Sequence, residues 1–363
     1  FMTVLGVAGC TALLLIGFGI QDSILPIVDK QSGQLTHNDL TISLSDEKAL
    51  TMEQGLADTL DSSSAVHSWG AFYTKSTTLY NEEGGSADVS IVGAEDDARM
   101  TEYFTFRTRV GHDPIPFEED SVILTEKTAL NLELSVGDTF YVEAADGSRV
   151  PLVLTGITEN YMFTRLYLSG AQLESLLGGT PEWNTVYGLT GCTTEAEYNA
   201  LRTKLLGCNY VSSVSFTEDT TSMFGSLIGS LNYVVVLIIV CAAALAAVVL
   251  YNLISVNLAE RKKELATIKV LGFYDKEVYR YIFREIELLS LIGSGVGLLL
   301  GVPLHRFIVL TVEMDQLMFI RTIAPRSYLL AVALTMLFTF VVCFAMRRHV
   351  RHISMVESMK APE

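Results

Sequence analysis

The stretch YNLISVNLAERKKELATIKVLGFYDKEVYRYIFRE, residues 251–285, decides the fold of this chain. It is a charged segment between two apolar runs, residues 227–250 and 286–304. About 20 apolar residues cross a hydrocarbon layer roughly 30 Å thick, and both runs approach or exceed that length. The charged stretch predicts a cytoplasmic helical hairpin, because basic residues concentrate in cytoplasmic loops. Its basic residues are Arg261, Lys262, Lys263, Lys269, Lys276, Arg280 and Arg284.

Composition and charge predict four membrane spans and their directions. Half of the residues are hydrophobic, and the mean hydropathy of +0.37 is high for a soluble domain. The tail from Arg347 onward is basic, so we expect the C-terminus in the cytoplasm. Alternation of the spans then places the long segment 26–225 outside the cytoplasm. The four predicted spans are residues 2–20, 227–250, 286–304 and 327–346.

The long segment is strongly acidic. Residues 26–225 hold 30 Asp and Glu against 11 Lys and Arg, a net charge of −19, whereas the rest of the chain is slightly basic. This charge argues against nucleic acid as a partner and against docking on anionic lipid. The acidity is therefore confined to one side of the membrane.

The first apolar run starts at residue 1 without the basic flank that a first span normally carries. A cleaved signal peptide is the alternative, but no basic region precedes the apolar run and no convincing small-x-small site precedes Gln21. We therefore expect residue 1 to be a truncation point of a longer protein.

The acidic segment has an internal repeat that predicts its fold. Two β-α-β units stand at its ends, and together they predict a split ferredoxin-like layer, with a β-rich insertion at about residues 85–180. The fold class expected is an α+β membrane protein, with four transmembrane helices and an extracytoplasmic α+β domain. The units are strand 39–44, helix 47–60 and strand 65–74, then strand 184–189, helix 195–206 and strand 210–216.

Two sets of motifs carry a family resemblance. The hairpin reads ER-x-x-ELA-x-I-K-x-LG over residues 260–272, followed by Arg284-Glu285, and resembles the FtsX-like ABC transporter permease family. The stretches ILTEKTALNLELSVGD and VPLVLTGITEN, residues 123–138 and 150–160, resemble the extracytoplasmic core domain of its MacB-type branch. The order of span, outer domain, three spans and basic tail agrees with that family.

The resemblance implies a domain plan and a cellular place. It divides the chain into a first span (1–25), a MacB-like core domain (26–225), an FtsX-like domain (226–346) with a coupling hairpin (252–285), and a cytoplasmic tail (347–363). It also implies a multi-pass protein of the bacterial cell membrane. Larger family members carry two such permease halves, and this chain is similar to the C-terminal half of one.

The resemblance further implies a function. A separate cytoplasmic ABC ATPase would bind ATP, and this chain, paired with a second permease half or protomer in membrane lipid, would pass the motion to its outer domain. Export or release of a peptide, lipoprotein or antimicrobial compound is the expected output. The alternative is a transmembrane regulator that activates a cell-wall hydrolase or a signalling partner without transport. A membrane-anchored binding protein without an ATPase is the third class, but it would have no use for a structured cytoplasmic hairpin.

The hairpin itself has the pattern of a contact surface. Leu258, Leu265, Ile268 and Leu271 recur at helical spacing beside a charged face, and Gly272 stands where a helix would end. The alternative is that this face meets only water and lipid headgroups. The residues predicted to contact the ATPase are Glu260, Arg261, Glu264, Leu265, Ile268, Lys269 and Gly272.

Glycines in the third span predict close helix packing. Gly293, Gly297 and Gly301 recur every four residues, and such small-residue stripes let helix backbones approach closely in membranes. A dinucleotide-binding loop made of Gly293, Gly295 and Gly297 is the alternative, but these glycines lie inside an apolar span.

Sequence motifs for catalysis are absent, so we expect no catalytic residue, cofactor site or metal site in this chain. No G-x-x-x-x-G-K-[ST] sequence occurs, the acidic clusters lack EF-hand spacing, and His112 has no neighbouring His or Cys. Cys192 and Cys208 flank the predicted helix 195–206, and the sequence leaves open whether they form a disulfide or stay free.

Overall fold

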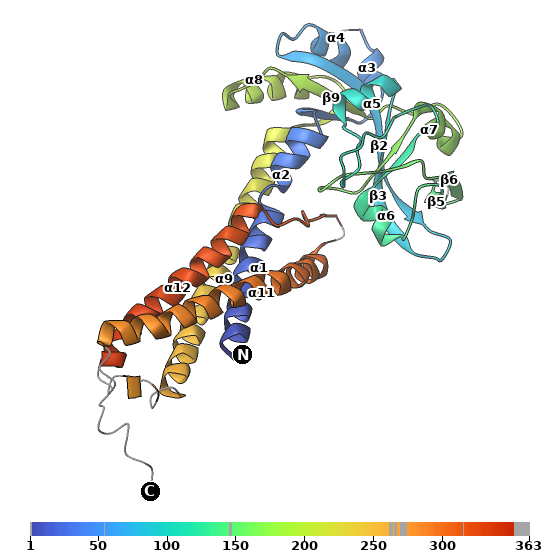
Figure 1. The fold of residues 1–363 in the computed structure, drawn as a ribbon. Helices are drawn as coiled ribbons and strands as arrows, with labels where there is room; N and C mark the ends of the chain where they lie inside the picture. The colour runs from blue at the N-terminus through green and yellow to red at the C-terminus, as the bar shows by residue number, and fades with distance from the viewer. Residues whose placement is uncertain are drawn as a thin grey trace. The chain divides into compact units, whose positions relative to one another are not determined.

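The computed structural model describes residues 2–53, 55–144, 147–260, 264, 267–268, 274–314 and 316–351. The chain divides into two compact units. One, called the head, comprises Pro26–Leu227 together with Glu313–Phe319. The other, called the bundle, comprises Phe1–Leu25, Ile228–Val312 and Ile320–Glu363. Figure 1 shows the elements of both units.

Among the described residues of the bundle, four helices each contain a stretch long and apolar enough to cross a membrane. This confirms the predicted number of spans. Pro303 lies inside the third helix, where it removes one backbone hydrogen bond. The helices are α1 (Met2–Ile24), α9 (Thr217–Glu260, whose first part belongs to the head), α11 (Asp275–Val312) and α12 (Pro325–Arg351).

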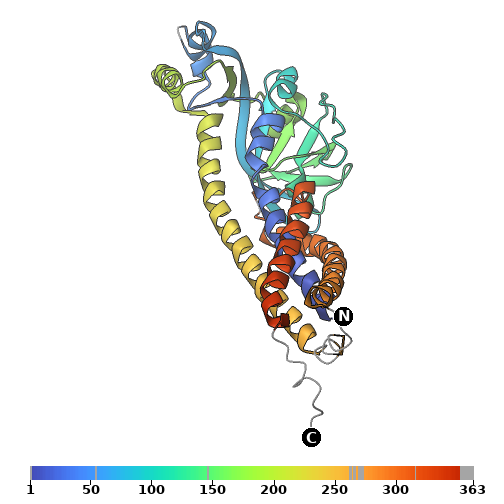
Figure 2. The ribbon, with the colours of Figure 1, turned by 60° about the vertical axis from the view of Figure 1, so that its left-hand side comes forward.

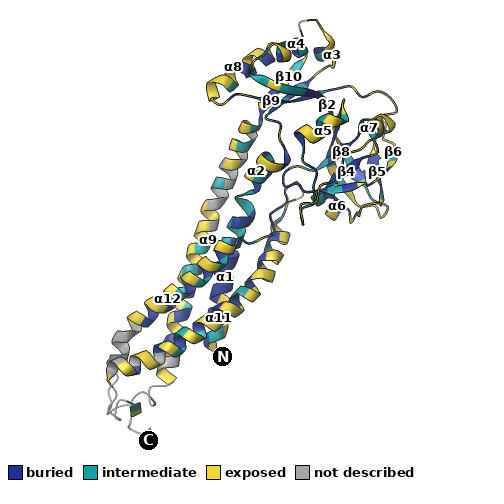
Figure 3. Cartoon of the chain, turned by 45° about the horizontal axis from the view of Figure 1, so that its top comes forward, coloured by how far each residue is buried: buried dark blue, intermediate teal, exposed yellow. Residues whose placement is uncertain are grey.

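Helix α1 is the central element of the bundle. Its Leu14 and Leu15 are fully buried in a cluster with Ala242 of α9 and Ala331 of α12. Figures 1 and 2 both draw α1 beside α11. The outer faces of the other helices expose large apolar side chains, among them Leu237 of α9, Leu299 of α11 and Phe344 of α12. Figure 3 colours many residues of these three helices as exposed. Such exposure suits a surface that meets lipid or another membrane helix.

The head contains one ten-stranded sheet. Four antiparallel strands at one end follow the order β10-β1-β9-β2, the order that two interleaved β-α-β units produce, and the predicted α+β fold class is confirmed. Helix α8 (Glu195–Leu206) begins at a capping box formed by Thr194 and Glu197. The strands are β1 (Leu40–Leu44), β2 (Val66–Tyr80), β9 (Thr185–Thr190) and β10 (Val211–Phe216).

The prediction of one continuous helix over residues 47–60 is wrong. Two short helices, α3 (Lys48–Thr51) and α4 (Leu56–Asp61), stand in its place. The chain turns back so tightly at Gly55 that a Cβ there would lie 2.8 Å from two backbone carbonyl oxygens, those of Ala49 and Met52. Only glycine accepts that approach, so one long helix does not form.

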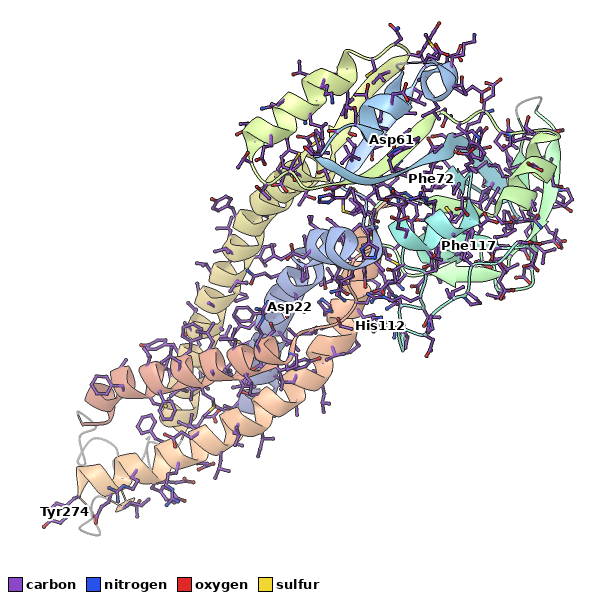
Figure 4. The ribbon with its side chains drawn as sticks, turned by 90° about the horizontal axis from the view of Figure 1, so that it is seen from above. Asp22, Asp61, Phe72, His112, Phe117 and Tyr274 are labelled. Carbon is purple, nitrogen blue, oxygen red and sulfur yellow. The ribbon has the colours of Figure 1, made fainter. Side chains whose placement is uncertain are left out.

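The two faces of this layer are covered differently. Helices α3, α4 and α8 pack on one face, through a core that includes Ile42, Leu60 and Leu205. Helix α5 (Asp97–Tyr103) packs on the other face, where Tyr103 meets Phe72 edge to face with ring centres 5.6 Å apart. Figure 3 shows both sets of helices, and Figure 4 labels Phe72 and Phe117 of the aromatic face.

The β-rich insertion continues the same sheet. Strand β2 is long enough to serve both parts, since its residues 66–72 pair with β9 and its residues 72–80 pair with β3. The added elements are β3 (Ser86–Ala94), β4 (Val122–Thr125), β5 (Thr139–Glu143), β6 (Arg149–Val153), β7 (Gly156–Thr158), β8 (Arg165–Leu168), α6 (Glu126–Asn131) and α7 (Gly170–Leu177).

A short helix α2 (Ile27–Lys30) and a π-helical turn η1 (Gln31–Leu35) open the head directly after α1 in the sequence. They supply residues to the site described next. Cys192 and Cys208 are free thiols, Cys192 buried and Cys208 half-buried. The disulfide that the sequence left open is therefore not formed in this structure.

Candidate coupling site

The predicted ATPase-contact residues are only partly within the described part of the chain. Glu260 closes α9 and Glu264 follows it, and both are exposed. Ile268 is half-buried and packs on a bundle cluster that contains Val278 and Phe283. Arg261, Leu265, Lys269 and Gly272 lie outside the described residues. Tyr274, labelled in Figure 4, is 78% exposed and immediately precedes α11.

A second candidate site lies in the head, where the segment between α11 and α12 joins it. We call this site the junction; it consists of Gln31, residues 160–163 and residues 316–318. Met162 and Leu317 form an antiparallel β-bridge. The N–H of Phe163 donates to the carbonyl of Gln316 at 3.0 Å, and the N–H of Met318 donates to that of Tyr161 at 3.0 Å. The segment between α11 and α12 is therefore hydrogen-bonded into the head through its backbone.

Gln31 forms hydrogen bonds to the loop of residues 160–163. Its Oε1 accepts from the backbone N–H of Tyr161 at 2.9 Å and of Met162 at 3.2 Å. Its Nε2 donates to Asn160 Oδ1 at 2.8 Å and to the Thr36 hydroxyl at 2.9 Å. All the polar atoms of this buried side chain are thus satisfied, which a buried amide requires. The loop is fixed between the segment that follows α1 and the segment that follows α11.

An ion pair anchors the junction further. Lys127 Nζ lies 2.9 Å from Glu313 Oε2, and the Glu313 side chain is only 1% exposed. The other oxygen of Glu313 accepts from the N–H of Phe319 at 2.8 Å. Removal of one partner of a buried pair typically costs about 3–5 kcal/mol, because the remaining charge is left uncompensated.

The buried carboxylate of Glu159 holds the adjoining loop, residues 160–163, through its hydrogen bonds. Glu159 is fully buried and accepts from Arg107 Nε at 2.6 Å and from the Tyr161 hydroxyl at 2.5 Å, with His112 Nδ1 at 3.4 Å. Burial raises the pKa of Tyr161, and the hydrogen bond to Glu159 raises it further. Tyr161 therefore stays a neutral donor, and the cluster is a structural clamp. Figure 4 labels His112.

Within the bundle, α1 ends in its own polar network. Asp22, labelled in Figure 4, is buried and accepts from Ala324 N at 3.0 Å, Arg326 Nη2 at 3.1 Å and Ser327 Oγ at 2.5 Å. The next residue, Ser23, meets His305 Nε2 of α11 at 3.1 Å. One end of α1 is thus bonded to both α11 and the start of α12.

The three glycines of the predicted packing stripe all face α1. A Cβ at Gly297 would lie 2.5 Å from the Ala8 carbonyl oxygen. One at Gly293 would lie 2.8 Å from the Val7 Cβ, and one at Gly301 would lie 2.8 Å from the Leu15 Cδ2. At Gly293 and Gly297 backbone atoms of α1 lie so close that a side chain must separate the helices, whereas at Gly301 it must displace the Leu15 side chain or separate them.

Sequence reasoning missed the junction and the Asp22 network. Available signals were weak: an acidic residue, Glu313, directly after the apolar run 307–312, and an isolated Asp22 at the end of a span. Among the described residues no group of three metal-ligating side chains occurs. The junction consists of hydrogen bonds and packing contacts that position segments of the chain.

Comparisons with known proteins cover most of the chain. A family model for the MacB-like periplasmic core domain matches residues 2–202, and one for the FtsX-like permease C-terminal domain matches residues 236–355. No curated protein matches the chain.

Two solved structures show distant likeness to about half of it. The periplasmic region of MacB from Actinobacillus actinomycetemcomitans is 13% identical, with a TM-score of 0.33, and the match covers 52% of this chain and 93% of that one. The extracellular domain of the ABC-type transporter YknZ from Gram-positive bacteria is 14% identical, with a TM-score of 0.33, covering 50% and 99%.

Proposed function

The chain belongs to the family of FtsX-like permeases with a MacB-like periplasmic core domain, and from that premise we propose that it transmits the motion of a separate cytoplasmic ATPase to its extracytoplasmic head. ATP would be bound and hydrolysed by the partner. The cargo would be an extracytoplasmic peptide, lipoprotein or antimicrobial compound.

The observation that carries this proposal is that Glu313–Phe319 belongs to the head. The chain passes between bundle and head four times, after Leu25, Leu227, Val312 and Phe319. A head that only needed an anchor would require one such passage. Four passages, one of them fixed by a buried ion pair, support a role in which helix movement is transferred to the head.

The charge pattern supports the direction of transfer. Seven basic residues in the hairpin 251–285 and the basic tail favour a cytoplasmic position for both, and the acidic head lies outside the cytoplasm. Glu260 and Glu264 are exposed and free to meet a partner surface. A second permease half or protomer would cover apolar side chains such as Leu237 and Leu299, which are 61% and 77% exposed.

The test begins with co-purification of this chain and the candidate ATPase, followed by reconstitution in vesicles. The double reversal Arg261→Glu/Glu264→Lys should abolish the stimulation of ATP hydrolysis by this chain. Unchanged stimulation would refute the role of the hairpin.

A second variant separates coupling from transport. Lys127→Glu should leave ATP hydrolysis stimulated while cargo release falls, because the repelled Glu313 no longer holds the junction. Lys48→Glu in the exposed pair with Asp46 is the matched control and should behave as wild type. Stimulated hydrolysis in wild type with no cargo movement at all would favour the regulator instead.

A further inference from the structure

A cavity of about 170 Å³ lies inside the head beside the junction. Asn38, Arg165 and Tyr187 supply its polar and aromatic wall, and Met162 and Phe163 of the junction also line it. We call it the Arg165 cavity. At roughly 30 Å³ for each water molecule in the liquid, its volume is that of about six waters. It therefore accepts a small molecule or a chain end and not a folded partner.

Two buried polar groups of this cavity have no hydrogen-bond partner. One is the Arg165 Nη1 nitrogen, and the other is the Oδ1 oxygen of Asn38, a residue that is 95% buried. The Asn38 Nδ2 is already used, since it donates to the Thr41 hydroxyl at 3.1 Å. Leaving a buried donor or acceptor unsatisfied typically costs about 1–3 kcal/mol, and more for a charged group. Native proteins rarely accept that cost without a reason.

The cavity also leaves the charge of Arg165 without a counter-ion. None of the described residues that line it is Asp or Glu. The Arg165 guanidinium instead faces the rings of Phe104 and Phe163, at 5.5 Å and 5.9 Å. Burial raises the pKa of Tyr187, although the nearby Arg165 opposes that rise, so Tyr187 does not supply a negative charge at neutral pH. An anionic group from outside would complete the site.

The remaining lining specifies more of the ligand. Asn38 Oδ1 calls for an N–H or O–H donor close to the anion. Val28, Met162 and Phe163 offer an apolar surface, and Phe163 is 42% exposed. We propose that the Arg165 cavity binds a small carboxylate with a neighbouring hydrogen-bond donor and a short apolar group. A free amino acid and the C-terminal residue of a peptide share this chemistry.

A ligand in this cavity would contact the two segments that connect the head to α1 and α9. Ser32, which follows α1, and Thr221, near the start of α9, both line it, and their hydroxyls lie 3.3 Å apart. A bound carboxylate would hold together the segments through which the chain enters and leaves the head. Binding does not require the ATPase, so it is tested apart from the proposed function.

The experiment uses the full chain in detergent, without a partner, and three probes. N-acetyl-alanine mimics a peptide C-terminus, alanine represents a free amino acid, and N-acetyl-alaninamide lacks the carboxylate. Calorimetric titration should show binding of at least one carboxylate with about millimolar affinity, as expected of a fragment-sized ligand. The amide should bind at least ten-fold more weakly. Binding of only N-acetyl-alanine identifies a peptide end, and binding of only alanine identifies a free amino acid.

Variants then locate the binding. Asn38→Asp keeps the side-chain shape and places a carboxylate in the cavity with Arg165, so it should fold at least as well as wild type and bind the probe at least ten-fold more weakly. Asn199→Asp makes the same charge change on an exposed position of α8 and should bind normally. Arg165→Gln should also lose binding, and if it does not fold, Asn38→Asp still decides. The proposal is overturned if no carboxylate binds better than the amide at about 10 mM, or if Asn38→Asp folds and binds unchanged.

Discussion

The substitution Gly297→Ala, which adds one methyl group, tests the close packing of α11 on α1. The substitution Gly297→Ala places a Cβ 2.5 Å from the Ala8 carbonyl oxygen, 2.7 Å from the Thr11 Cβ and 3.1 Å from the Ala8 Cα. Carbon contacts are comfortable at about 3.5–4.0 Å, so α1 and α11 must move apart by roughly 1 Å there. Two of the three atoms belong to the backbone, and no rotamer change relieves the clash.

The magnitude follows from two opposing effects. Overpacking of a tight contact costs about 1–3 kcal/mol, whereas replacing a helical glycine by alanine gains up to about 1 kcal/mol. Gly295→Ala is the matched control, because a Cβ at Gly295 meets nothing within 4 Å. The control should therefore be neutral or slightly stabilised, and Gly297→Ala should be less stable than the control by about 1–3 kcal/mol.

The assay is reversible unfolding of the full chain in mixed micelles, with both variants measured beside wild type. Separation of α1 from α11 also disturbs the hydroxyl bond from Thr11 to Thr335, which is 3.1 Å long. Gly297→Leu should be more damaging still, because its side chain enters the space of Thr11 as well. Equal stability of Gly297→Ala and Gly295→Ala would refute the close packing of these helices.

Three further predictions concern the head. Gln31→Leu leaves two backbone N–H groups of the junction without an acceptor and should destabilise the head by about 2–4 kcal/mol in urea unfolding. The substitution Asn131→Ala at an exposed position should change stability by less than about 1 kcal/mol. Burial raises the pKa of Asp39, so its contribution to stability is complete below the unfolded value of about 3.9 and is lost as the pH rises through the folded pKa. Wild type should therefore lose thermal stability relative to Asp39→Asn as the pH rises from about 4 toward 7, and the opposite trend would contradict the burial of this carboxyl. Cys192 and Cys208 should both react with a thiol reagent after denaturation without reductant, and mass spectrometry that finds neither labelled would show that they form a disulfide.

Local and periodic features of the fold were accessible from the sequence. Apolar length gave the four spans, and alternation gave the strands on either side of α8, whose predicted bounds agree with the structure. The four-residue spacing of Gly293, Gly297 and Gly301 was visible because residues that far apart lie on one helix face. The continuous helix over 47–60 failed because the chain turns at Gly55, where the close approach to the Ala49 and Met52 carbonyls accepts only glycine.

The junction could not be predicted because its parts are far apart in the chain. Gln31, residues 160–163 and residues 316–318 have no shared period, and the bonds between residues 160–163 and 316–318 run through the backbone, which leaves little trace in residue type. Asn38 and Arg165 are likewise separated by more than a hundred residues, and their lack of partners is a property of the folded head. Only Glu313 was visible in the sequence, as an ionisable residue directly after the apolar run 307–312.

The junction and the Arg165 cavity share three residues, Gln31, Met162 and Phe163, which links the two proposals. Met162 pairs with Leu317, the N–H of Phe163 donates to the Gln316 carbonyl, and both residues also line the cavity. A ligand that fixes these residues must favour one arrangement of the segment between α11 and α12. Linkage is reciprocal. If the ligand changes the affinity of the chain for one state of the ATPase by some factor, that ATPase state must change the affinity for the ligand by the same factor, typically about 5–150-fold. Titration of N-acetyl-alanine into the complex should therefore give different affinities with and without a non-hydrolysable ATP analogue. The Asn38→Asp complex should show no such difference, while its ATP hydrolysis should still be stimulated. Equal affinities in the wild-type complex would mean that the cavity binds its ligand without any part in transmission.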